Sequence, residues 1–126
     1  MANLTTFQLF AGHPSLKIFS LWSPTATFAD PISVAEGSDR YKAQWYGLPA
    51  LFHPIKIQSH KVKSAGNPIE IGLTTTYTVK GIKKEQTIES IVHIYVSDDG
   101  KISKLEDRWN GKLPEGAVTD VSTDMQ

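Results

Sequence analysis

The sequence predicts an α+β fold in which helices come first and an antiparallel sheet follows. Up to about residue 54 the apolar residues recur at helical spacing, and from residue 56 to residue 109 they alternate with polar residues as in strands. Turn residues separate the alternating segments, so these strands are expected to pair as hairpins. A sheet of this kind has to bury one face, and we expect that face to pack on the helices.

The composition is typical of one globular domain and excludes several classes of protein. The chain has 126 residues, with 13 Lys+Arg, 13 Asp+Glu and no Cys. Such a chain buries about two thirds of its surface, and Cys-based metal or redox sites are excluded. Zero net charge argues against nucleic-acid binding, which needs clustered Lys and Arg. No apolar run approaches the ~18 residues of a membrane span. We expect a cytoplasmic protein with no membrane partner.

Two helices are predicted in the first half of the chain. The first begins near Pro14 and ends before Pro24, with apolar residues at roughly helical spacing. The second runs from about residue 39 to residue 54, after a turn and an N-cap at residues 37–39. A short β-prone segment, residues 25–30, lies between the two helices.

Four strands are predicted in the second half. They span residues 56–63, 69–79, 84–96 and 101–109. The last two are joined by a loop that contains Asp99-Gly100, as in a tight hairpin. We therefore expect a single domain over residues 1–111 and a flexible C-terminal tail over residues 112–126.

Alternate side chains of a strand point to opposite faces, so the period of two predicts what is buried. On the last strand Leu105, Asp107 and Trp109 share one face, and Ile102 falls on the other face. Asp107 is therefore flanked on both sides by large apolar side chains. The same period gives the second strand an apolar face, formed with Thr75 by Ile69, Ile71, Leu73, Tyr77 and Val79.

The third strand has apolar residues on both faces. Val92 belongs to one face, whereas Ile91, His93 and Tyr95 belong to the other. Both faces are thus expected to be covered, which suggests that the outer one meets a partner subunit.

Three features of the sequence occur together: the string Ala26-Thr27-Phe28-Ala29-Asp30-Pro31, Gly37 before a helix, and residues 99–102 leading to Asp107-Arg108-Trp109. With these features the chain resembles the nuclear transport factor 2-like superfamily, which includes ketosteroid isomerases, SnoaL-like polyketide cyclases and scytalone dehydratase. The resemblance covers residues 14–111, and the chain is similar to small SnoaL-like proteins of fungi. The resemblance implies a cone-shaped sheet around a deep apolar pocket, and homodimers formed through the outer sheet face.

The resemblance also implies candidate catalytic residues. Asp30 stands where the ketosteroid isomerases have their proton-abstracting carboxylate. Counting along the chain places Thr6 and Val92 where those isomerases have the two donors of their oxyanion hole. Neither residue is the donor found there, so a steroid isomerase that uses the usual hydrogen bonds is not expected.

A carboxyl group in an apolar pocket loses hydration, which raises its pKa toward neutrality. We expect Asp107 to be the main acid/base and Asp30 its partner, with no metal and no cofactor. Two alternatives stay open. The Asp30 side chain would only bond a backbone N–H in an Asp-Pro turn, and Asp107 would pair with a cation such as Arg40 or be turned to solvent by a bulge.

The predicted function is a cofactor-independent isomerase, cyclase or dehydratase that acts on a small, apolar, oxygenated metabolite. The alternative is a non-catalytic ligand-binding or dimeric adaptor module of the same fold. We expect Trp45 and Trp109 either to stack on a planar ligand or to pack in the core. Thr75 and Tyr77 are candidates to hydrogen-bond a ligand oxygen, and the alternative is that Tyr77 packs and its hydroxyl reaches a carbonyl at the rim. The complete set of ligand-binding candidates is Trp45, Leu73, Thr75, Tyr77, Val92, Leu105 and Trp109.

Overall fold

The computed structural model describes residues 2–31 and 33–109. It contains three helices and one sheet of six strands in the order β2-β1-β6-β5-β4-β3. The elements are α1 (Ala2–Phe10), α2 (Leu16–Phe19), β1 (Trp22–Asp30), β2 (Ser33–Glu36), α3 (Ser38–Leu51), β3 (Phe52–Ser64), β4 (Ile69–Val79), β5 (Glu85–Val96) and β6 (Ile102–Trp109). The predicted tail, residues 112–126, lies outside the described residues.

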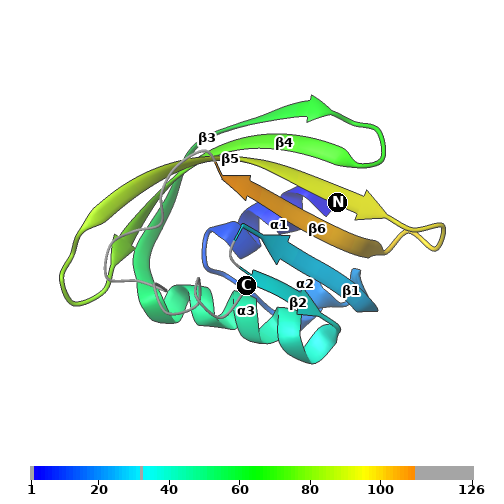
Figure 1. Cartoon of the computed structure of the whole chain (residues 1–126), viewed down its shortest axis with the longest axis horizontal. Coiled ribbons are helices and arrows are strands. Elements are labelled where there is room, and N and C mark those ends of the chain that lie inside the picture. Colours follow the sequence, from blue (N-terminus) through cyan, green and yellow to red (C-terminus); the bar gives the residue numbers. More distant parts are fainter. Residues whose placement is uncertain (1, 32, 110–126) are drawn as a thin grey trace.

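The α+β fold is confirmed. Figure 1 shows a curved sheet that arches over the helices, with α3 along one end of the arch. The sheet is open, because β2 and β3 lie at its two edges. The strands β3 to β6 pair antiparallel in sequence order, as hairpins require. The pairing of β1 with β6 is parallel, and it joins the first strand to the last.

The first half of the chain differs from the prediction at three places. The predicted helix that starts near Pro14 is only the four-residue α2, and Trp22 already opens β1. Pro24 lies inside β1, where the register with β6 shifts. Regular hydrogen bonding between the strands is interrupted there, so the strand tolerates a residue without an N–H. The helix α1 and the strand β2 are additional elements. The short sequence of α1 has no charged residue in its first or last turn that would indicate a helix end.

The inner face of the sheet carries the core. The predicted inward set on β4 is buried except for Ile69, which is half-buried, and Ile71 and Leu73 are at most 3% exposed. The assignment of Ile102 to the outer face is wrong, since its side chain is 1% exposed. Tyr95 pairs with Lys104 whereas Val96 pairs with Ile102, so β6 holds one extra residue at this point. That bulge reverses the alternation before it and turns Ile102 inward.

No helix in the described part of the chain is long and apolar enough to cross a membrane.

The core predicts where a truncation is costly. Ile94 is fully buried on β5, and Ile94→Ala should lower the free energy of unfolding by about 2–5 kcal/mol, because it leaves a cavity. The matched control is Ile82, which is 62% exposed between β4 and β5. Ile82→Ala should change the free energy of unfolding by less than about 0.5 kcal/mol. Urea unfolding of both variants measures the difference. Equal losses would contradict this assignment of the core.

Candidate active site

Asp30 and Asp107 are brought together by the parallel pairing of β1 and β6. Ala29 lies opposite Glu106, so one residue further along both strands Asp30 comes beside Asp107. A pocket of about 210 Å³ opens at this end of the strands. It is lined by Ala29, Asp30, Pro31, Glu106, Asp107, Arg108 and Trp109. The two predicted carboxylates therefore share one pocket.

The Asp107 side chain points inward and is only 5% exposed. The indole Nε1–H of Trp109 donates a hydrogen bond of 2.6 Å to its Oδ2. Its Oδ1 is buried and has no hydrogen-bond partner among the residues that the structure describes. Burial raises the pKa of Asp107 to about 7, and the charge of Asp30 adds to this effect, whereas the Trp109 indole and the Ser90 hydroxyl oppose it.

Neither alternative for Asp107 describes its surroundings. Within residues 2–31 and 33–109, no Lys or Arg forms an ion pair with Asp107. Arg40 lines a different pocket, with Val34 and Glu36. The bulge in β6 lies between Ile102 and Lys104, and it leaves Asp107 facing inward.

Asp107 belongs to a row of buried polar side chains that crosses the inner face of the sheet. Thr75 on β4, Ser90 on β5 and Asp107 on β6 are 2%, 7% and 5% exposed. The strand registers place them on a diagonal, each two residues from the position directly opposite the next. The row separates two apolar clusters, of which the first includes Leu73, Trp45, Val92 and Leu105 and the second consists of Phe52, Tyr77, Val79 and Ile88.

Ser90 is a member of this site that the sequence reasoning missed. It lies between Ile88 and Val92 on the inner face of β5, and its hydroxyl lowers the pKa of Asp107. A polar residue at an inward position of an otherwise apolar strand face was the available signal.

Asp30 is held at the end of β1 by a local turn. Its Oδ1 accepts hydrogen bonds from the backbone N–H of Ser33 at 2.8 Å and from the Ser33 hydroxyl at 3.2 Å. Gln44 of α3 in turn donates to Ser33 Oγ at 2.7 Å. The turn bonding considered as the alternative for Asp30 is thus present. The same residue also lines the pocket, so the turn fixes the carboxylate there.

The other predicted ligand-binding residues are divided between the two clusters. Trp45 packs edge-on against Phe10 at a ring distance of 4.9 Å and lies in the first cluster. Tyr77 packs against Phe52 at 5.3 Å in the second cluster, and burial raises its pKa. Of the predicted set, only Asp30, Asp107 and Trp109 line the pocket.

Two positions from the family resemblance are also placed. Thr6 is fully buried in α1. Val92 is fully buried and lies directly opposite Asp107 in the β5–β6 pair. Val92 is therefore the cross-strand neighbour of Asp107.

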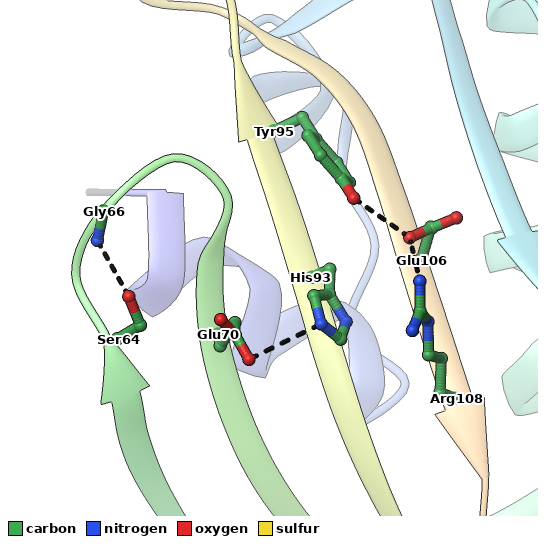
Figure 2. Close-up of polar contacts among 7 residues, drawn as sticks. All are labelled: Ser64, Gly66, Glu70, His93, Tyr95, Glu106 and Arg108. Carbon is green, nitrogen blue, oxygen red and sulfur yellow. Dashed lines mark hydrogen bonds and ion pairs between the residues drawn. The ribbon is translucent and has the colours of Figure 1, made fainter.

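The outer face of the sheet carries a separate polar network. Figure 2 shows His93 and Tyr95 on the side of the sheet that faces away from the helices. His93 Nε2 lies 3.6 Å from a carboxylate oxygen of Glu70, and the Tyr95 hydroxyl donates to Glu106 at 3.2 Å. Arg108 also donates to Glu106, at 3.1 Å. His93 and Tyr95 do not line the pocket, whereas Glu106 and Arg108 reach its rim from the outer face. In the described residues, no group of three or more His, Asp or Glu is arranged to hold a metal ion.

The raised pKa of Asp107 predicts how stability depends on pH. The folded state keeps this proton up to about pH 7, whereas an unfolded Asp releases it near its ordinary pKa of 3.8. Between these values the folded state binds more protons, so the Asp107 contribution to stability falls as pH rises, by an amount on the order of 4 kcal/mol. Above pH 7 this contribution levels off.

Asp107→Asn should remove this decline and leave the variant more stable than the wild type at pH 8. Glu89→Gln, at an exposed position on β5, is the control and should keep the wild-type pH dependence. Urea unfolding at several pH values between 4 and 8 measures both. Parallel curves for Asp107→Asn and the wild type would show that Asp107 titrates normally.

Comparison with known proteins assigns the chain to a family. The SnoaL-like domain matches residues 5–105. No curated protein gives a significant match. Because matches to solved structures are below 25% identity, they show the fold alone.

A nuclear transport factor 2-like protein from Anabaena variabilis has a TM-score of 0.75 and 19% identity, over 88% of this chain and 85% of that chain. TerC, co-crystallised with polyporic acid, has a TM-score of 0.70 and 15% identity, over 86% and 88%. A protein from Catenulispora acidiphila with a ketosteroid isomerase-like fold, in complex with trimethylamine, has a TM-score of 0.70 and 13% identity, over 97% and 92%. The chain belongs to the SnoaL-like domain family and has the nuclear transport factor 2-like fold.

Proposed function

We propose that this protein is a cofactor-independent acid/base enzyme that isomerises, cyclises or dehydrates a small, apolar, oxygenated metabolite. The observation that carries the proposal is the buried carboxyl of Asp107, whose pKa of about 7 lies far above that of an exposed Asp. A group that titrates near neutral pH can both donate and accept a proton under physiological conditions. Asp107 also lines a pocket, where a ligand would reach it.

Asp30 is the proposed partner of Asp107. It lines the same pocket, and its negative charge contributes to the raised pKa of Asp107. Its hydrogen bonds with Ser33 fix the carboxylate at the end of β1. Two carboxyl groups in different surroundings can supply one acid and one base without a metal. In this proposal Asp107 transfers the proton, and the charge of Asp30 raises the pKa of Asp107.

The chemistry of the ligand is inferred from a polar atom that the protein leaves unsatisfied. Asp107, which lines the pocket, has a buried Oδ1 with no hydrogen-bond partner among the described residues. Such an atom costs about 1–3 kcal/mol, which a hydrogen bond from an oxygenated ligand would offset. The apolar clusters on either side of the polar row favour a ligand whose remaining surface is apolar. The complex of TerC with polyporic acid supports a small organic ligand in this fold.

A ligand-binding or adaptor protein without catalysis is the second candidate. It is favoured by the hydrogen bonds that already engage Asp30 and by the ring packing that holds Trp45 in the first cluster. Both features are typical of structural roles, and they would allow the pocket to bind a ligand without reacting with it.

Mass spectrometry of the purified protein, followed by assays on the compound it retains, tests the proposal. Asp107→Asn should lower turnover or proton exchange about 10²–10⁴-fold, because Asn cannot transfer the proton. Asp99→Asn, in the exposed hairpin between β5 and β6, is the control and should keep the wild-type rate. An unchanged rate in Asp107→Asn would refute the catalytic role of Asp107. A bound compound that the wild-type protein does not convert would favour the non-catalytic ligand-binding protein.

We also propose that two copies associate through the outer face of the sheet. Ile91 and Tyr95 on β5 belong to this face and are partly exposed. The protein should sediment as a dimer at micromolar concentration, and Ile91→Glu should weaken association at least about tenfold, since it buries a charge. Val62 on β3 is 45% exposed and pairs with the inward-facing Ile71, so it lies on the inner face of the sheet. Val62→Glu is therefore the control, and this variant should remain dimeric. A wild-type monomer at this concentration would rule out the dimer.

A further inference from the structure

We infer that Trp109 is a positioning residue, which holds the Asp107 carboxyl so that Oδ1, and not Oδ2, is the oxygen that exchanges the proton. The inference rests on the proposed function and assigns a role to a side chain that the proposal treats only as pocket wall. It identifies which of two chemically equivalent oxygens is kept available.

The hydrogen bond between the two side chains distinguishes the oxygens. Asp107 and Trp109 are two residues apart on β6, so both point to the inner face. The indole has one donor and no acceptor, and it gives this donor to Oδ2 at 2.6 Å. The carbonyl oxygen of a neutral carboxyl is a better acceptor than its O–H oxygen, so the short bond from the indole favours Oδ2 as the carbonyl oxygen. When Asp107 is neutral, its proton is then on Oδ1, which is buried without a protein hydrogen-bond partner in the described structure.

The indole is itself held in place. Trp109 is partly buried and packs against the second apolar cluster, which is built from β3, β4 and β5. On β5 it lies directly opposite Ser90. The ring is thus fixed by contacts that do not involve Asp107, and it can orient the carboxyl group rather than follow it.

The hydrogen bond also affects the acidity of Asp107. A donor at Oδ2 stabilises the charged form and so works against burial, which is the largest cause of the raised pKa. The titratable groups that act on Asp107 from the packed strands are Asp30 on β1 and Tyr77 on β4. Glu106 and Arg108 line the same pocket, but they belong to the outer face and bond to each other.

The test uses the wild-type protein, whose three Trp residues each give one indole N–H signal in a nitrogen-15 NMR spectrum. The Trp109 signal should shift with pH and follow the titration of Asp107, with a midpoint near pH 7. The Trp22 and Trp45 signals should not follow it, because neither indole N–H has a hydrogen-bond partner in the described structure. Three single Trp→Phe variants assign the signals. A Trp109 signal that does not titrate would overturn the inference.

Trp109→Phe tests the same bond from the side of Asp107. The substitution removes the N–H and keeps an aromatic ring, so the pKa of Asp107, followed by carbon-13 NMR of its carboxyl, should rise by about one to two pH units. Trp22→Phe is the matched control and should leave this pKa unchanged. A pKa that stays constant or falls in Trp109→Phe would also overturn the inference. If this variant does not fold, the wild-type titration decides alone.

These measurements need no ligand, so the two ideas fail separately. A titrating Trp109 signal in a protein that converts no compound would refute the proposed function but keep the hydrogen-bond geometry. An active enzyme whose Trp109 signal does not titrate, and whose pH–rate profile is the same in Trp109→Phe, would keep the function and refute the positioning role.

Discussion

The burial of one carboxyl group on an apolar sheet face is the constraint on which the site depends. A charge in such a place is costly, and the group responds by holding its proton to a higher pH. At Asp107 burial outweighs the hydrogen bond from Trp109 and the effect of Ser90, so the pKa reaches about 7. The buried polar row of Thr75, Ser90 and Asp107 separates the core into two apolar clusters. The carboxyl therefore lies where the protein packing changes from one cluster to the other.

The topology of the sheet decides what lies beside that carboxyl. Hairpin pairing alone would place β5 next to β6 and leave the other side of β6 as an edge. The parallel pairing with β1 covers that edge and brings the end of β1 to Asp107. β1 ends at Asp30, where Ser33 closes a turn, and β6 continues for two more residues that pair with β5 only. The pocket lies at this mismatch between two strand ends.

The local alternation predicted much of this arrangement and the long-range pairing could not be predicted. The span of β4 and the inward direction of Asp107 follow from the period of two, because both strands are regular there. Ile102 was assigned to the wrong face because a bulge adds a residue, and the alternation in the sequence carries no mark of it. β2 is too short for a periodic signal. That Asp30 and Asp107 lie side by side was only a hypothesis from the sequence, because no pattern in either strand indicates a parallel partner.

The unfavourable energetics of Asp107 favour a functional role over a structural one. A structural carboxyl is normally stabilised by cations or by several donors, and such partners lower its pKa. Among the described residues, Asp107 has a short hydrogen bond from Trp109, a smaller effect from Ser90, an Oδ1 without a hydrogen-bond partner and the Asp30 carboxylate beside it. Its negative charge is therefore poorly compensated. An apolar residue would fill the same inward position at lower cost. A group that destabilises the fold at neutral pH, yet is oriented by a well-packed indole, is typical of a site where binding or reaction supplies the missing interaction.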